Sequence, residues 1–201
     1  MKRNTISVGL LSVAIILAGR PATAAADQRL QYYDAINPDK NFKLTDQNGE
    51  PFELKGLRGK VVLLFFGYLS CPDVCPVTLS KLSRVYQQLD DKEREEIQTV
   101  FISVDSYRDT PDKIKEYLSY FSINAVGLTG DQMDIDFVVE DFDAWYQIVK
   151  SSSALGYLID HTSYVYLLDQ EGNVRYLFRP DDDVDHMTKI IRQVHRAKTG
   201  N

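Results

Sequence analysis

Residues able to carry metal or redox chemistry are scarce in this sequence, which has two cysteines and three histidines among its 201 residues. An excess of basic residues is also lacking, and the formal charge is −6. An acidic chain offers no basic patch for a phosphate backbone, which argues against nucleic-acid binding. The hydrophobic content of 44% and the charged content of 26% are ordinary for a globular domain with its own core.

Long apolar runs are missing as well, since none reaches the roughly 20 residues that a membrane-spanning helix needs. The apolar run Ile6 to Ala18 follows two basic residues and precedes small-residue cleavage sites at residues 22–26. This pattern predicts a signal peptide over residues 1–26, and an uncleaved membrane anchor is the alternative. We therefore expect an exported protein, in the periplasm or at the outer face of the inner membrane, with membrane contact only through such an anchor. Without residues 1–26 the formal charge is −9, because three basic residues and no acidic ones are removed.

Both cysteines lie where a continuous apolar run passes into a turn. Lys60 to Phe66 predicts a central strand that is buried on both faces. Cys71 and Cys75 follow its end, and Pro76 suits the first turn of a helix. A disulfide between cysteines this close would add little chain-entropy stabilisation. A helix N-terminus lowers the pKa of a thiol, and the thiolate both attacks disulfides and binds metal. A structural disulfide, a redox pair and a metal site all stay open at this point.

The rest of the chain alternates between predicted strands and helices. A β-hairpin is predicted within residues 42–54, and further strands are predicted at residues 98–104, 126–130, 162–168 and 174–178. Helices are predicted at residues 76–89, 111–121, 132–145 and 183–197. A solvated turn is expected at residues 90–96, and an inserted loop or short hairpin at residues 146–160. This order predicts one α/β domain, residues 27–201, with a mixed sheet and a site at the carboxyl ends of its central strands.

Each of the three histidines could supply a further ligand. His195 lies among basic residues in the last helix, where a surface position suits the helix dipole. His186 lies at an acidic helix start, where a solvated or capping role is expected. His161 stands at the predicted entry to a strand that should face the cysteine turn. Because thiolates select Cu(I) and imidazole also suits copper, two cysteines and one histidine would make a three-coordinate site. A hydrogen-bonded histidine at a strand start is the alternative for His161.

Four blocks of the sequence agree with a single family pattern. They are residues 66–76 (FGYLSCPDVCP), residues 103–111 (SVDSYRDTP), residues 127–130 (GLTG) and residues 160–163 (DHTS). In this order they resemble the Sco family, whose members bind copper, help to assemble cytochrome c oxidase and have a thioredoxin-like fold. Two places depart from the usual pattern, Ser106 and the pair Leu69-Ser70, and neither removes a candidate ligand.

The resemblance implies a thioredoxin-like fold with an N-terminal β-hairpin and an inserted loop before the fourth core strand. It further implies that Cys71, Cys75 and His161 bind one copper ion, for which Cu(I) is expected and binding of Cu(II) as well is left open. The two cysteines would also cycle between dithiol and disulfide. Asp73 and Asp160 are expected to tune the site through contacts around the ligands. Their plainer interpretations are a helix cap for Asp73 and a solvated acid for Asp160.

The function implied by the resemblance is that of a metallochaperone for cytochrome c oxidase. Such a protein delivers copper to the copper-site subunit or reduces the cysteines of that subunit, and other periplasmic copper chaperones are further expected partners. A general thiol–disulfide oxidoreductase, or a thiol peroxidase or redox sensor, is the alternative. Ordinary thioredoxin-like oxidoreductases resemble one another in a Cys-x-x-Cys pair and a cis-proline opposite it. Here three residues separate the cysteines, and His161 stands where that proline is expected, which favours copper.

Overall fold

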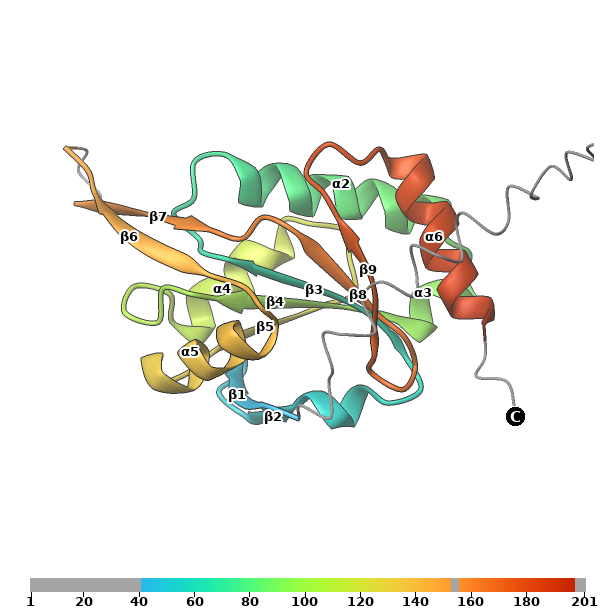
Figure 1. Cartoon of the computed structure of the whole chain (residues 1–201), viewed down its shortest axis with the longest axis horizontal. Coiled ribbons are helices and arrows are strands. Elements are labelled where there is room, and N and C mark those ends of the chain that lie inside the picture. The colour runs from blue at the N-terminus through green and yellow to red at the C-terminus, as the bar shows by residue number, and fades with distance from the viewer. Residues whose placement is uncertain (1–40, 153–155, 198–201) are drawn as a thin grey trace, which may run out of the picture.

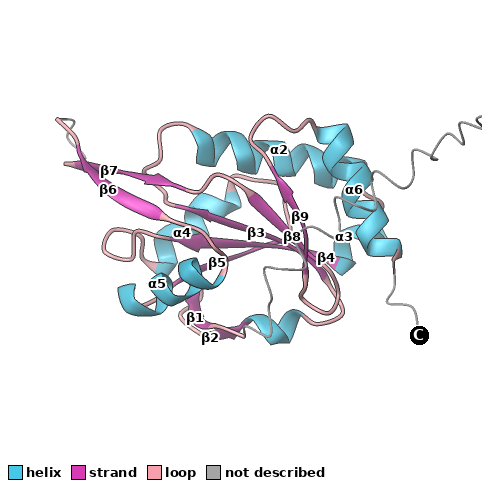
Figure 2. Ribbon diagram, in the orientation of Figure 1, coloured by secondary structure: helices cyan, strands magenta, loops and turns pink. Residues whose placement is uncertain are grey.

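The computed structural model describes residues 41–152 and 156–197, which form a mixed β-sheet packed between helices (Figures 1 and 2). The predicted signal peptide lies outside the described residues. None of the helices in the described ranges is long and apolar enough to cross a membrane.

The elements have the following bounds in chain order: β1 (Lys43–Asp46), β2 (Pro51–Glu53), the 3-10 helix η2 (Leu54–Leu57), β3 (Val61–Gly67), α2 (Val74–Gln88), α3 (Asp91–Glu96), β4 (Ile97–Ser103), α4 (Pro111–Ser119), β5 (Ala125–Thr129), α5 (Gln132–Asp141), β6 (Tyr146–Lys150), β7 (Tyr157–His161), β8 (Val165–Leu168), β9 (Val174–Phe178) and α6 (Val184–Arg196).

The central sheet has the strand order β2-β1-β5-β4-β3-β8-β9. Strands β3, β4 and β5 run parallel, whereas β1 and β8 pair with them in the antiparallel sense. Phe65 of β3 lies opposite Phe101 of β4 on one side and Val165 of β8 on the other. The predicted mixed α/β sheet and the N-terminal hairpin β1–β2 are therefore confirmed.

Strand β3 is the centre of the core, and all of its residues are buried. Because successive side chains of a strand point to opposite faces, β3 contributes to two apolar layers. Its odd-numbered residues pack with α2, α4 and α6: Val61, Leu63 and Phe65. Its even-numbered residues pack with α5, η2 and the inserted hairpin: Val62, Leu64 and Phe66. Figure 1 shows α2 and α6 on one side of the sheet and α5 on the other. This double burial fixes the strand end that precedes the cysteines.

Residues 91–96 form the short helix α3 with Asp90 as its N-cap, so the expectation of a solvated turn at residues 90–96 is wrong. The Asp90 carboxylate accepts a hydrogen bond from the Glu93 N–H at 2.8 Å, and the Glu93 carboxylate accepts one from the Asp90 N–H at 3.0 Å. This reciprocal capping box satisfies two N–H groups at the helix start. Glu93 is buried and its carboxylate is also bound by Arg192 of α6 at 2.8 Å. This highly charged segment therefore forms a helix because Asp90 and Glu93 find hydrogen-bond partners within the fold.

The inserted segment is a β-hairpin in which β6 pairs antiparallel with β7. The hairpin forms a separate two-stranded sheet and extends away from the central one (Figure 1). A strand was expected at residues 162–168, but β8 begins only at Val165, and His161 ends β7 instead of opening β8. The reason is that the N–H and the hydroxyl of Thr162 both bond to the backbone of Trp145, which closes the base of the hairpin.

The acidic helix α5 also ends earlier than its sequence pattern indicates, at Asp141 instead of near Trp145. Asp143 has a φ of 50°, a left-handed conformation that an α-helix does not continue through. The chain then passes through Trp145, which borders the same cavity as Cys71, and enters β6 at Tyr146.

Candidate metal centre

The cysteine turn connects β3 to α2 and is tied to the neighbouring loop. The Leu69 N–H donates to the carboxylate of Asp109 at 2.9 Å, and the Cys71 N–H donates to the Tyr68 carbonyl at 3.3 Å. Cys71 is half-buried in the turn, whereas Cys75, in the first turn of α2, is fully buried. The two sulfurs therefore differ in how readily a partner can reach them.

Gly67 allows the sulfur of Cys75 to lie against the end of β3. A Cβ atom at Gly67 would stand 2.8 Å from Cys75 Sγ and 2.8 Å from the Phe101 ring. Both contacts are shorter than van der Waals packing allows, so only glycine fits without displacing the sulfur or the ring.

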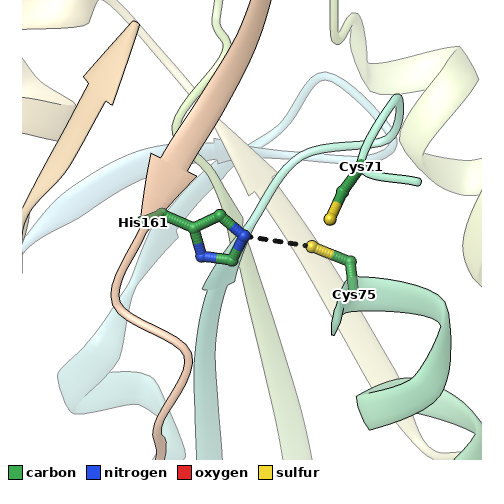
Figure 3. Close-up of side chains that lie close together, drawn as sticks. All are labelled: Cys71, Cys75 and His161. Atoms are coloured by element: carbon green, nitrogen blue, oxygen red, sulfur yellow. Dashed lines mark hydrogen bonds between the residues drawn. The ribbon is translucent and has the colours of Figure 1, made fainter. Parts of the chain in front are cut away.

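His161 comes from the far end of the chain and lies beside both cysteines (Figure 3). Its Nε2 atom is 3.4 Å from Cys75 Sγ, and the donor atoms of Cys71, Cys75 and His161 all lie within 4.8 Å of one another. In the described ranges this is the only group of histidine, cysteine or acidic residues able to hold a metal ion. The structure thus brings together the three ligands that the sequence indicated, although their binding of metal stays a prediction.

The hydrogen bond at the other ring nitrogen sets the tautomer of His161. Nδ1 lies 2.9 Å from the Thr162 carbonyl, and a carbonyl oxygen can only accept, so Nδ1 carries the proton. In the neutral imidazole the lone pair is then on Nε2, the nitrogen that faces the sulfurs. The rings of Phe65 and Tyr68 contact the imidazole edge-on, with centroids at 6.1 and 5.8 Å, and hold its orientation.

The two thiols have opposite acidities. A hydrogen bond from Cys75 lowers the pKa of Cys71 to about 4, and backbone N–H groups of the turn add to the effect. The pKa of Cys75 is raised, because this thiol keeps the proton that it donates to Cys71 and because it is buried. Cys71 is therefore the thiolate at neutral pH, whereas Cys75 is the protonated thiol.

Asp73 and Asp160 line the mouth of the site, and the backbone N–H of Asp73 bonds to the Cys71 sulfur. Both side chains are exposed and border a cavity of about 350 Å³ that also includes Cys71, His161 and Trp145. Asp73 occupies the N-cap position of α2, yet its side chain makes no capping hydrogen bond. Within the described residues neither carboxylate bonds to a candidate ligand, so a tuning role would act through charge and stays a prediction.

Two further contributors were not found from the sequence. Tyr68 is 1% exposed, and its hydroxyl accepts a hydrogen bond from the Ile159 N–H of β7 at 3.1 Å. Thr162 contributes its carbonyl to His161. Tyr68 could have been suspected, because a tyrosine at the end of a buried strand needs a partner for its hydroxyl. The carbonyl of Thr162 leaves no signal in the sequence.

The other two histidines belong to helix α6 and lie outside this cluster. His186 Nε2 lies 3.1 Å from the Tyr176 hydroxyl, and its backbone N–H is capped by Asp183. His195 was expected at the surface, but its side chain is only 15% exposed and contacts the Glu96 carboxylate. It is covered because α6 packs against the end of α3, so that the pair joins the two helices.

In thioredoxin-like proteins, a strand of a parallel pair leads into two cysteines at the start of a helix, as β3 does here. In this chain an imidazole completes a cluster of three donor atoms. The family model described as SCO1/SenC matches residues 31–196. The chain belongs to the SCO1/SenC family.

Comparison with individual proteins agrees with this assignment. An SCO2-like protein of Rickettsia prowazekii is 40% identical over 188 residues, which cover 93% of this chain and 91% of the relative. The structure of Bradyrhizobium japonicum ScoI with copper bound has a TM-score of 0.70 and 36% identity, covering 77% of this chain and 97% of that one. Yeast Sco1 with copper bound has a TM-score of 0.71 and 31% identity, covering 79% and 88% of the two chains.

A more distant structure shares the fold. BsSco, a member of the Sco family of cytochrome c oxidase assembly proteins with a disulfide switch, has a TM-score of 0.61 and 24% identity and covers 79% of this chain and 94% of its own. The predicted thioredoxin-like fold is confirmed by these likenesses, and the copper-bound relatives support copper as the metal.

Proposed function

We propose that Cys71, Cys75 and His161 bind one copper ion, held as Cu(I) by the reduced dithiol and accepted as Cu(II) in a second state. The observation that carries this proposal is the clustering of the three donor atoms within 4.8 Å, with the lone pair of His161 on the nitrogen that faces the sulfurs. Two thiolates and an imidazole form a soft donor set that suits Cu(I). The copper in Bradyrhizobium japonicum ScoI and yeast Sco1 supports this choice.

The proposed role is that of a metallochaperone in the assembly of cytochrome c oxidase. The chain would take copper from other periplasmic copper proteins and deliver it to the copper-site subunit, outside the inner membrane, after export directed by residues 1–26. Membership of the family to which the assembly protein BsSco belongs supports this role. The half-buried Cys71, which borders the cavity, provides the point at which a receiving ligand could reach the ion.

Reduction of the receiving cysteines is the second candidate function, favoured by the unequal acidity of the two thiols. The Cys71 thiolate would attack one sulfur of the client disulfide, form a mixed disulfide and release the first client thiolate. Cys75 would then lose its proton, attack the Cys71 sulfur and release the second client thiolate. Two electrons pass to the client, which becomes a dithiol, and the chain retains the Cys71–Cys75 disulfide.

Cu(I) affinity measured by competition with a chelator under anaerobic conditions tests the site. The reduced, purified chain should bind one Cu(I). Cys71→Ala, Cys75→Ala and His161→Ala should each weaken binding by about 100-fold or more, at or beyond the 10–100-fold typical of contacts around metal ligands. His186→Ala serves as the control, because His186 lies in α6 and contacts Tyr176. An affinity in the His161→Ala protein equal to that of the control would refute the three-donor site.

A client fragment distinguishes delivery from reduction. The soluble copper-site domain of the oxidase subunit is offered to the chain with its cysteines either reduced or joined in a disulfide. Delivery predicts copper transfer to the reduced fragment, which His161→Ala abolishes. Reduction predicts dithiol formation in the oxidised fragment without copper, which His161→Ala leaves in place and Cys71→Ala abolishes. If neither fragment changes, both proposed roles fail.

A further inference from the structure

The strand that ends with His161 is not paired with the central sheet. In the described residues β6 and β7 pair only with each other, whereas both cysteines follow the central strand β3. The distance between the imidazole and the sulfurs therefore depends on residues 162–164, which link β7 to β8, and on side-chain contacts between the hairpin and the sheet. A side chain that clamps β7 would control the geometry of the site without being a ligand.

Arg108, in the loop that follows β4, makes such a clamp. Its guanidinium lies 3.6 Å from the centroid of the Tyr157 ring and donates to the Tyr157 carbonyl at 3.1 Å. Arg108 is in turn paired with Asp105, whose carboxylate accepts a hydrogen bond from the Tyr157 hydroxyl at 2.7 Å. The Arg108 side chain is 18% exposed and that of Asp105 is 2% exposed. Charged groups this buried need bonding partners within the protein. Here Arg108 and Asp105 bond to each other and to Tyr157, the first residue of β7.

The same loop also holds the cysteine turn. Asp109 is 2% exposed, and its carboxylate accepts hydrogen bonds from the Ser103 hydroxyl at 2.6 Å and from the Leu69 N–H at 2.9 Å. Arg108 lies 5.8 Å from the centroid of Tyr68, whose hydroxyl binds the Ile159 N–H of β7. Residues 105–109 thus contact both halves of the site, the turn with the cysteines and the strand with the histidine.

We propose that Arg108, held by Asp105, is a positioning residue that sets His161 at its distance from Cys71 and Cys75. The inference rests on the proposed copper site for its effect on metal affinity, whereas its effect on the hairpin can be measured without metal. Loss of the guanidinium should release the first residue of β7 and increase the motion of the strand. The three donors would then have to be ordered when the ion binds, which weakens binding.

The test compares Arg108→Gln with Arg192→Gln. Arg192 is a matched control, because it also pairs with a buried carboxylate, that of Glu93, but lies between α6 and α3. Arg108→Gln should accelerate hydrogen exchange at the Ile159 and His161 amides of the metal-free chain and lower Cu(I) affinity by about tenfold or more. Arg192→Gln should lower the melting temperature but leave both readouts as in the unaltered chain.

Tyr157→Phe provides a milder variant in case Arg108→Gln fails to fold. It removes the hydrogen bond to Asp105 and keeps the ring beneath the guanidinium, so it should change both readouts in the same direction by a smaller amount. Tyr120→Phe is its control, since Tyr120, the residue after α4, is 74% exposed. Exchange rates and Cu(I) affinities in the Arg108 and Tyr157 variants that match those of their controls would overturn the proposal. If the unaltered chain binds no copper, the proposed function fails, and the exchange rates of the metal-free proteins alone decide the positioning role.

Discussion

The two cysteines are separated by three residues and one turn of backbone, yet the fold makes them chemically unequal. Cys71 is half-buried with a lowered pKa, and Cys75 is buried with a raised pKa. The difference arises because the Cys71 sulfur accepts hydrogen bonds as a thiolate, whereas the Cys75 thiol keeps its proton in order to donate one. Each consequence at this scale can be tested with a single reagent or a single substitution.

Alkylation should distinguish the two thiols. Treatment of the reduced, metal-free chain with iodoacetamide at pH 6 should label Cys71 and leave Cys75 unlabelled, because only Cys71, with a pKa of about 4, is a thiolate at that pH. The rate at Cys71 should stay constant above pH 6 and fall as the pH drops through about 4. Peptide mass spectrometry after timed labelling measures both rates. Equal labelling of the two cysteines at pH 6 would contradict the assigned acidities.

Gly67→Ala should disturb both stability and the site. The added methyl group would stand 2.8 Å from Cys75 Sγ and from the Phe101 ring, so we expect a loss of about 1–3 kcal/mol in the free energy of unfolding and a weaker affinity for Cu(I). Gly56→Ala is the control, since a Cβ there has no neighbour within 4 Å. Denaturant unfolding and Cu(I) competition measure the two effects. A Gly67→Ala protein as stable as the control would show that the strand end is looser than described.

At the residue scale the sequence was most informative about residue types that are rare in this chain, namely cysteine and histidine. Cys71, Cys75 and His161 could be selected because the chain has so few thiols and imidazoles. Tyr68 and the carbonyl of Thr162 could not, because tyrosines are common and a carbonyl belongs to every residue. Their roles depend on which backbone group lies opposite them, and only the folded chain determines that.

At the scale of elements, apolar patterns in the sequence predicted the strands and helices that form the core. Strand β3 could be recognised because it is buried on both faces, and α2 because its apolar side chains share one face. Helix α3 could not, because its sequence DKEREE has no apolar residue and its stability comes from caps and from Arg192. His161 was assigned to the wrong strand, because the bonds between Thr162 and Trp145 that end the hairpin are not visible in the local pattern.

Removing the cap of α3 should destabilise the protein measurably. Asp90→Ala loses the hydrogen bond to the Glu93 N–H, and we expect a cost of about 0.5–2 kcal/mol in the free energy of unfolding. Asp91→Ala is the matched control, because its side chain is 98% exposed and only approaches Arg94 at 3.4 Å, for which about 0.5 kcal/mol or less is expected. Urea unfolding of the two variants measures the difference. Equal costs would mean that the capping box does not hold the helix.

At the scale of the whole molecule, the last helix, α6, is bonded to α3, which lies about a hundred residues earlier in the sequence. Arg192 of α6 binds both carboxylate oxygens of Glu93, at 2.8 and 3.0 Å, and donates to the Gln88 carbonyl at 2.6 Å. His195 contacts Glu96 one turn further along. These contacts join the C-terminal helix to the end of α2 and to α3.

The pair between Arg192 and Glu93 should make stability depend on pH. The hydrogen bond from Arg192 lowers the pKa of Glu93 below its ordinary value of 4.5. Its contribution is therefore complete above the unfolded-state pKa and is lost as the pH falls through the lower folded-state pKa. Arg192→Gln should cost about 1–2 kcal/mol at pH 7, a moderate value because solvent reaches the 34%-exposed arginine.

The difference between the unaltered chain and Arg192→Gln should shrink below about pH 4.5, as Glu93 becomes protonated. Thermal unfolding of both proteins between pH 7 and pH 3 measures the trend. A difference that stays constant over this range would show that the arginine acts through packing and not through charge.

The unequal exposure of the sulfurs also gives the donors an order. Cys71 and His161 border the cavity, whereas Cys75 is covered on every side and lies outside the cavity wall. If the proposed site holds copper, an incoming ligand would reach Cys71 first, and Cys75 would be the donor replaced only after the others. Release of an ion from this site would thus proceed as a stepwise exchange in one direction, with Cys75 as the last point of attachment. A recipient that offers its own ligands one at a time would match that sequence without ever leaving the ion free in solution.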